Sequence, residues 1–206
     1  MIKCKTTVPG LLTAGGRGND GDMSSMSLWT NPLFQPPNCT VFPLPEAMSG
    51  HTLSYSEDTM IACYGTSCLR MTDSNWTHLQ DTLEERRGHT ATVLGKRILL
   101  AGGRDYAATT TEWMPMDGGV SVPGFRLWGG REGHCVIKIS DSRIIFTGGR
   151  NPRNQLLASV TEYSVLEECG WDMAHRELPG LDTPLVGHAC GVYQREGRTV
   201  RAVALL

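Results

Sequence analysis

The 206-residue sequence predicts an all-β fold built from repeated four-stranded antiparallel units. The first observation is a near-duplicate, because residues 97–104 read RILLAGGR and residues 143–150 read RIIFTGGR. The second is a Gly-His pair that occurs four times, with spacings of 38, 45 and 54 residues between the histidines at 51, 89, 134 and 188. The third is that helical periodicity is weak along the chain. Recurrence at this period is the mark of a repeat architecture.

Each of the first three Gly-His pairs is followed, about fourteen residues later, by a β-rich run that ends in glycine. These runs are TMIACYG, RILLAGG and RIIFTGG; an earlier run, GLLTAGG, and the final TVRAVALL resemble them. Residues 97–101 and 143–147 are apolar at consecutive positions, so both faces of each predicted strand must be covered. We therefore expect inner strands that lie between neighbouring sheets.

The second half of each unit recurs more loosely. It appears as MSLW up to Trp29, TTTEWMPM around Trp113 and SVTEYSV around Tyr163, and a tryptophan closes a unit at Trp76 and Trp171. Each unit thus has about four short runs separated by turn residues, which predicts a four-stranded meander. Only DTLEERR, at 81–87, has helical character, and it predicts a single helical turn.

This pattern resembles the kelch repeat, a β-propeller unit with a glycine pair after its second strand and a tryptophan near its fourth. The resemblance covers nearly the whole chain, and its signature is the four histidines, the two tryptophans and these glycines: Gly15, Gly16, Gly65, Gly102, Gly103, Gly148 and Gly149. It implies one propeller domain of about four blades over residues 1–206. The expected blades span 50–87, 88–132 and 133–186, with partial blades at 1–49 and 187–206. Since kelch rings usually have six or seven blades, the resemblance also implies a fragment of a longer protein.

The glycine pairs allow two interpretations, a phosphate-binding loop or a geometric requirement. A phosphate loop needs a following helix, and none is predicted here. We therefore expect glycine because the inner strand turns back at a crowded position that requires positive φ or close backbone approach.

Composition and charge exclude some classes of partner. The chain has 19 basic and 21 acidic residues, which indicates neither nucleic-acid binding nor a membrane-surface patch. No run approaches the roughly 18 apolar residues of a membrane span, and MIKCKTTVPG lacks the apolar centre of a signal peptide.

The cysteines and two sequence triplets bear on the compartment. Cys63 and Cys68 flank a predicted hairpin turn, and the residues leave open whether they form a disulfide or stay free thiols. Asn38 and Asn75 begin N-glycosylation triplets, NCT and NWT, which matter only in a secreted chain. An extracellular location is favoured if a leader is missing from the sequence; otherwise the cytoplasm is expected.

No metal site and no cofactor is predicted from the six histidines. His51, His89, His134 and His188 occupy one repeat position, so each is expected in its own copy of a structural pocket. The galactose-oxidase class shares this propeller, but its copper site needs two tyrosines, one crosslinked to cysteine, and two histidines, and no such motif is recognisable. NDGD at 19–22 does not match a calcium-binding EF-hand loop and predicts a polar turn.

The remaining candidate site is the loop face, where repeat scaffolds carry binding residues. We expect it to include Arg17, Asn19, Asp20, Glu84, Arg86, Arg87, Arg104, Asp105, Tyr106, Arg126, Arg131, Arg150, Asn151 and Arg153. A ring of arginines would suit acidic peptides, although the arginines also recur simply because the unit recurs. The leading hypothesis is a non-enzymatic module that binds a protein, or a glycan, through this face. The alternatives are a galactose-oxidase-like copper enzyme and an extracellular structural propeller.

Overall fold

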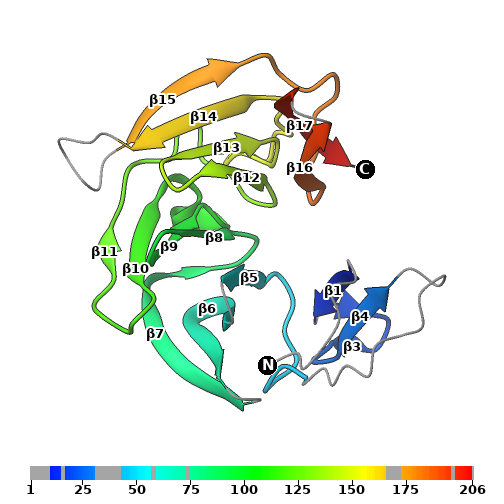
Figure 1. The fold of residues 1–206 in the computed structure, drawn as a ribbon, viewed down its shortest axis with the longest axis vertical. Coiled ribbons are helices and arrows are strands. Elements are labelled where there is room, and N and C mark those ends of the chain that lie inside the picture. Colours follow the sequence, from blue (N-terminus) through cyan, green and yellow to red (C-terminus); the bar gives the residue numbers. More distant parts are fainter. Residues whose placement is uncertain are drawn as a thin grey trace.

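The computed structural model describes residues 10–14, 17–30, 43–56, 59–72, 75–165, 173–195 and 198–205. Within them the fold is all-β and every strand pair is antiparallel, which confirms the predicted class. Figure 1 shows the sheets following one another along an arc, from β5–β7 through β8–β11 to β12–β15 and β16–β17.

Two sheets have the predicted four strands. One has the order β11-β10-β9-β8 and the other β12-β13-β14-β15. The strands of the first are β8 (Thr90–Leu94), β9 (Arg97–Ala101), β10 (Thr111–Pro115) and β11 (Val122–Pro123). Those of the second are β12 (Cys135–Ser140), β13 (Arg143–Thr147), β14 (Val160–Val165) and β15 (Met173–Leu178).

The sheet before these has three strands rather than four. They are β5 (Thr52–Ser56), β6 (Thr59–Thr72) and β7 (Asn75–Arg86). Strand β6 is 14 residues long and pairs with β5 through its first half and with β7 through its second, so it fills two strand positions. The helical turn predicted at 81–87 is wrong, because these residues pair with β6 and extend β7 to Arg86.

Smaller pairs stand at the two ends of the arc. Strand β1 (Gly10–Ala14) pairs with β4 (Met26–Thr30), β2 (Arg17–Gly18) with β3 (Gly21–Asp22), and β16 (Ala189–Arg195) with β17 (Arg198–Leu205). A 3₁₀ helix, η1 (Asp105–Thr109), follows β9 and was not predicted.

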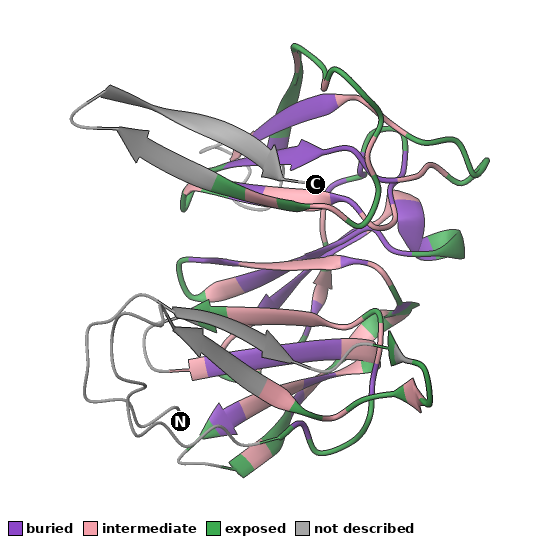
Figure 2. Cartoon of the chain, turned by 90° about the vertical axis from the view of Figure 1, so that its right-hand side faces the viewer, coloured by how far each residue is buried: buried purple, intermediate pink, exposed green. Residues whose placement is uncertain are grey.

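The core lies between consecutive sheets, as the continuous apolar runs predict. In β9, Ile98 and Leu100 pack toward β5–β7, while Leu99 and Ala101 pack toward β12–β15. All four side chains are buried, which confirms that both faces of this strand are covered. Figure 2 shows buried residues along the strands and exposed residues in the connecting loops.

A line of backbone hydrogen bonds joins the first strands of successive sheets. The Gly88 N–H donates to the Gly50 carbonyl at 3.0 Å, Gly133 to Gly88 at 2.7 Å, and Gly187 to Gly133 at 2.7 Å. Strand β5 contacts β8, β8 contacts β12, and β12 contacts β16 in the same order. The glycine of each Gly-His pair is therefore the point at which one unit is tied to the next.

The histidines at 89, 134 and 188 each reach a threonine of the preceding unit, and His89 Nε2 lies 3.5 Å from Thr52 Oγ1. Nε2 lies 2.9 Å from Thr90 Oγ1 in His134 and 2.8 Å from Thr147 Oγ1 in His188. Burial, with a smaller contribution from a neighbouring arginine, lowers the pKa of both His89 and His134 to about 3. Because they remain neutral, these side chains act as packed hydrogen-bonding groups.

The first glycine of each pair after β9 and β13 stands where a side chain would collide with residues at the start of the next unit. Gly102, Gly103, Gly148 and Gly149 all have positive φ. A Cβ at Gly148 would lie 2.6 Å from the Leu185 carbonyl oxygen and 2.8 Å from His188 Cε1. The geometric interpretation of these pairs therefore agrees with the structure, and no helix long enough to bind phosphate follows either pair within the described residues.

Two disulfides brace the described strands. Cys63 and Cys68 are bridged, with Cα atoms 4.1 Å apart. The chain reverses between the two cysteines, as predicted, because residues five apart in an extended strand would lie about 16 Å apart. Strand β6 includes this reversal, and its register with β7 shifts beyond Gly65. A second bridge, Cys135–Cys190, joins β12 to β16 and was not predicted. The sequence feature that could have predicted this bridge is the position of each cysteine, one or two residues after a repeat histidine.

Replacing Gly148 by alanine tests the packing at the glycine pair. Gly95 is the matched control, because its φ of 58° is close to the 57° of Gly148 and nothing lies within 4 Å of the position that a Cβ would occupy there. We expect Gly95→Ala to cost about 1 kcal/mol for the left-handed backbone alone. Gly148→Ala should cost at least about 2 kcal/mol more, measured by denaturant unfolding. Equal losses would show that close approach plays no part.

The neutral buried histidines predict a loss of stability in mild acid. The unfolded chain protonates these side chains near pH 6.5, whereas the folded chain does so only near pH 3. Stability should therefore fall as the pH drops through 6.5, by about 2 kcal/mol per histidine between pH 7.5 and pH 5. Unfolding of His89→Asn should depend less steeply on pH than unfolding of the unaltered protein. A flat profile for the unaltered protein would contradict this account.

Candidate functional site

The predicted arginines divide into two buried and several exposed members. Arg86 and Arg131 are each only 1% exposed, so their assignment to a binding face is wrong. The Arg86 Nε donates to Glu112 Oε1 at 2.6 Å, and its Nη1 donates to the carbonyl of Gly102 at 2.9 Å. This guanidinium ties the end of β7 to the glycine pair of the next sheet.

Arg131 has the equivalent role one unit later, where it bonds to carbonyl and hydroxyl groups rather than to a carboxylate. Its Nη1 donates to the carbonyls of Gly148 and Ser159, at 2.9 and 3.1 Å, and its Nη2 donates to Thr161 Oγ1 at 2.8 Å. Burial lowers the pKa of this guanidinium, against the opposing influence of Tyr163 and Glu177. Both buried arginines stand three residues before a repeat histidine and two before the tied glycine, and this spacing was the signal for their structural role.

Three exposed arginines and the half-buried Arg150 meet at an opening of about 460 Å³ formed by the tied glycines. Its lining includes Gly50, Gly88, Gly133 and Gly187, which carry no side chains to fill it. Four arginines reach the same opening from successive units of the chain: Arg17, Arg87, Arg104 and Arg150. The predicted convergence of arginines is thus present in the structure for these residues.

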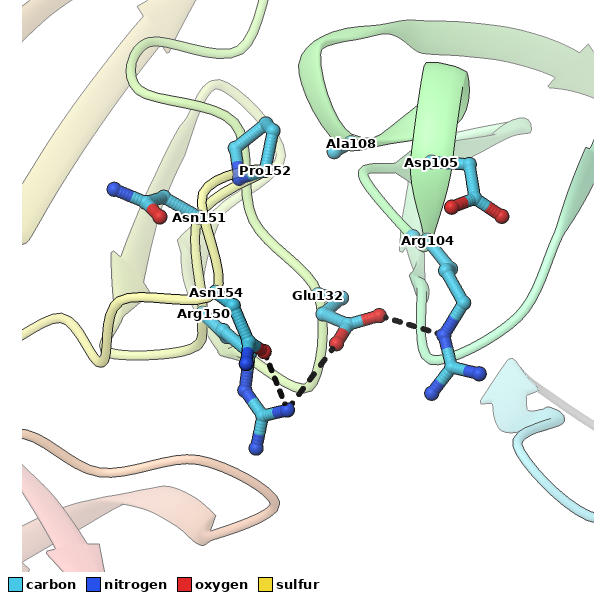
Figure 3. A pocket seen from close by; sticks show the side chains of 9 residues that line it. Arg104, Asp105, Ala108, Glu132, Arg150, Asn151, Pro152 and Asn154 are labelled. Atoms are coloured by element: carbon cyan, nitrogen blue, oxygen red, sulfur yellow. Dashed lines mark hydrogen bonds and ion pairs between the residues drawn. The ribbon is translucent and has the colours of Figure 1, made fainter.

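Glu132 is the acidic side chain in this lining, and sequence reasoning missed it. Its Oε2 accepts a hydrogen bond from Arg104 Nε at 3.1 Å, and its Oε1 lies 4.0 Å from Arg150 Nη1 (Figure 3). Arg150 also donates to Asn154 Oδ1 at 2.8 Å. One carboxylate therefore holds two guanidinium groups side by side, and the lining keeps an excess of positive charge.

Arg87 is held by an acidic neighbour and an aromatic one. Its Nε donates to Glu85 Oε1 at 3.1 Å, and its guanidinium lies 5.2 Å from the centre of the Tyr64 ring. The side chain is 55% exposed, and that of Arg104 is 66% exposed. Exposed ion pairs such as these contribute little to stability. A ligand carboxylate can therefore replace the protein partner of each guanidinium at little cost.

The other predicted loop residues surround this opening or lie beyond it. Asn19 and Asp20 are exposed in the turn between β2 and β3, in agreement with a polar turn. Asp105 begins η1, and the neighbouring Tyr106 is 94% exposed. Glu84 lies at the end of β7 and accepts a hydrogen bond from Thr110. Asn151, Arg153 and Arg126 line a second hollow, on the outer side of the loop that follows Gly149.

The remaining predicted residues belong to the glycosylation triplets and to the repeat signature. Asn75 is exposed at the start of β7, and Trp76 donates from its indole to the Pro43 carbonyl at 2.9 Å. Glycosylation at Asn75 stays a prediction. Gly15, Gly16, Asn38 and Trp171 lie outside the described residues.

The described residues lack two further kinds of feature. They contain no helix of the length and apolarity that a membrane span requires. They also contain no group of three or more His, Cys, Asp or Glu side chains arranged to hold a metal ion.

Comparison with known proteins adds no relative. No protein-family model and no curated protein matches the chain.

Replacing Arg86 separates the structural arginines from the exposed ones. Arg86→Ala leaves Glu112 buried without its partner, and breaking such a pair costs about 3–5 kcal/mol. The control is Arg104→Ala, which removes an exposed ion pair worth about 0–1 kcal/mol. The measurement is denaturant unfolding of both variants. Similar stabilities would contradict the division of the arginines into two groups.

Proposed function

We propose that this chain is a kelch-type β-propeller module that binds a protein partner through its arginine-lined opening, without catalysis. The repeated sheets, the tied Gly-His positions and the glycine pairs support the kelch-type assignment. The number of blades and their boundaries belong to this proposal as well.

The observation that carries the function is the convergence of Arg17, Arg87, Arg104 and Arg150 on one opening. They come from four successive parts of the chain, and a single carboxylate, that of Glu132, stands among them in the described lining. A partner that inserts acidic side chains would exchange weak exposed ion pairs for bidentate guanidinium–carboxylate contacts. The partner is therefore a protein segment rich in aspartate or glutamate.

The geometry also supports selectivity for a short acidic segment. The Glu132 carboxylate holds Arg104 and Arg150 as neighbours, so two guanidinium groups are presented together. Two nearby carboxylates in the partner would satisfy both, whereas a single charge would satisfy one. Complementary charge of this kind mainly raises association rate and specificity.

A binding titration tests this proposal. The full chain is titrated with a labelled peptide that carries two glutamates separated by glycine, and with the same peptide in which glutamine replaces glutamate. We expect the acidic peptide alone to bind, and the double variant Arg104→Glu/Arg150→Glu to weaken it at least about tenfold. Binding should also weaken as salt is added.

Lys96→Glu is the matched control. Lys96 is exposed in the β8–β9 turn, at the opposite end of β9 from Arg104, and the substitution makes the same change of charge at one position. It should leave the affinity unchanged. Equal binding of the glutamine peptide, or equal loss in the Lys96 variant, would overturn the proposal.

A further inference from the structure

A second hollow lies beside the arginine-lined opening and is separate from it. It has a volume of about 820 Å³ and lies between the chain segment before β12 and the loop that follows Gly149. Asn151 and Pro152 line both this hollow and the small pocket of about 270 Å³ shown in Figure 3. Arg150, which lines the arginine-lined opening, directly precedes Asn151 in the chain, so the two sites are adjacent.

The hollow contains a tryptophan that is held in place yet left open to solvent. Trp128 is 61% exposed, although its indole stacks on the His175 ring at 5.5 Å between centres with an interplanar angle of 21°. Its backbone N–H donates to the Tyr163 hydroxyl at 2.8 Å, and Tyr163 is buried. A supported but exposed indole offers a flat apolar surface to a ligand.

The charged groups around the indole are two arginines, which donate hydrogen bonds. Arg126 and Arg153 are exposed, and neither guanidinium has an ion-pair partner within the described part of the chain. No aspartate or glutamate among the described residues lines the hollow. The Asn151 oxygen already accepts the backbone N–H groups of Arg153 and Gln155. The site thus lacks acidic groups and presents two uncompensated positive charges.

We propose that this hollow binds an acidic saccharide, one that carries a carboxylate or sulfate group. The C–H face of a sugar ring would lie on the Trp128 indole. The anionic group would accept hydrogen bonds from Arg126 and Arg153, which pair bidentately with such oxygens. Pockets that combine an aromatic surface with a few well-placed polar groups are typical ligand sites.

Charge complementarity favours this ligand over the alternatives. A neutral sugar would leave both guanidinium groups unused. A simple inorganic anion would leave the indole unused. This site does not rest on the function proposed for the arginine-lined opening, because none of those four arginines lines it.

The test is calorimetric titration of the full chain with a disaccharide of glucuronic acid and sulfated N-acetylgalactosamine. Lactose and sodium sulfate are the comparison ligands. We expect the acidic disaccharide to bind, with a shift of one indole N–H signal in the NMR spectrum that is missing in Trp128→Ala. Trp128→Ala and the double variant Arg126→Gln/Arg153→Gln should each weaken binding at least about tenfold.

Matched controls separate this site from general effects. Tyr106→Ala removes another exposed aromatic ring outside the hollow, and Lys96→Glu reverses an exposed charge in the β8–β9 turn; both should bind the disaccharide normally. If Trp128→Ala unfolds, the arginine double variant, altered only at exposed side chains, still decides the question. Equal binding of lactose, equal binding of sulfate alone, or normal binding by the arginine double variant would overturn the proposal.

Discussion

The structure depends on the close approach of successive sheets at the glycines of the Gly-His pairs. Backbone hydrogen bonds from Gly133 to Gly88 and from Gly187 to Gly133, each 2.7 Å long, bring the starts of neighbouring units into direct contact at these points. Gly50, Gly88, Gly133 and Gly187 all have positive φ, between 58° and 70°, a backbone conformation that disfavours residues with a side chain. The histidine that follows Gly133 reaches Thr90 of the preceding unit, where burial keeps it neutral.

The same constraint explains why one residue type has two roles. Arg86 and Arg131 stand two residues before a tied glycine, which directs them into the interior, and there they bind the carbonyls of Gly102 and Gly148. Arg104 and Arg150 follow the glycine pairs, so they emerge beside the opening. The buried arginines therefore hold the loops from which the exposed ones project. Removing a buried arginine leaves buried polar groups without hydrogen-bond partners. The arginines at the opening remain accessible to a ligand.

The two proposed sites share one loop but differ in chemistry. The opening gathers positive charge around glycines that carry no side chains, which suits the carboxylates of an extended protein segment. The outer hollow adds an aromatic surface, Trp128, to its positive charge, which suits a sugar ring with an acidic group. Since Arg150 lines the opening and the next residue, Asn151, lines the hollow, a ligand in one site lies close to a ligand in the other.

The sequence by itself determined the all-β class, the inner strands and the reason for glycine, because these follow from local patterns. The apolar run at 97–101 requires burial on both faces, and the recurring Gly-His pair and glycine pair mark equivalent positions in each unit. Only the tertiary structure decided which arginines are buried, since Arg86 and Arg87 are adjacent in the chain and differ in the side of the strand on which they emerge. It also decided that 81–87 extends β7, because pairing with β6 outweighs a weak helical preference. The Cys135–Cys190 bridge and the Trp128 hollow likewise depend on contacts between distant segments, which no local pattern specifies.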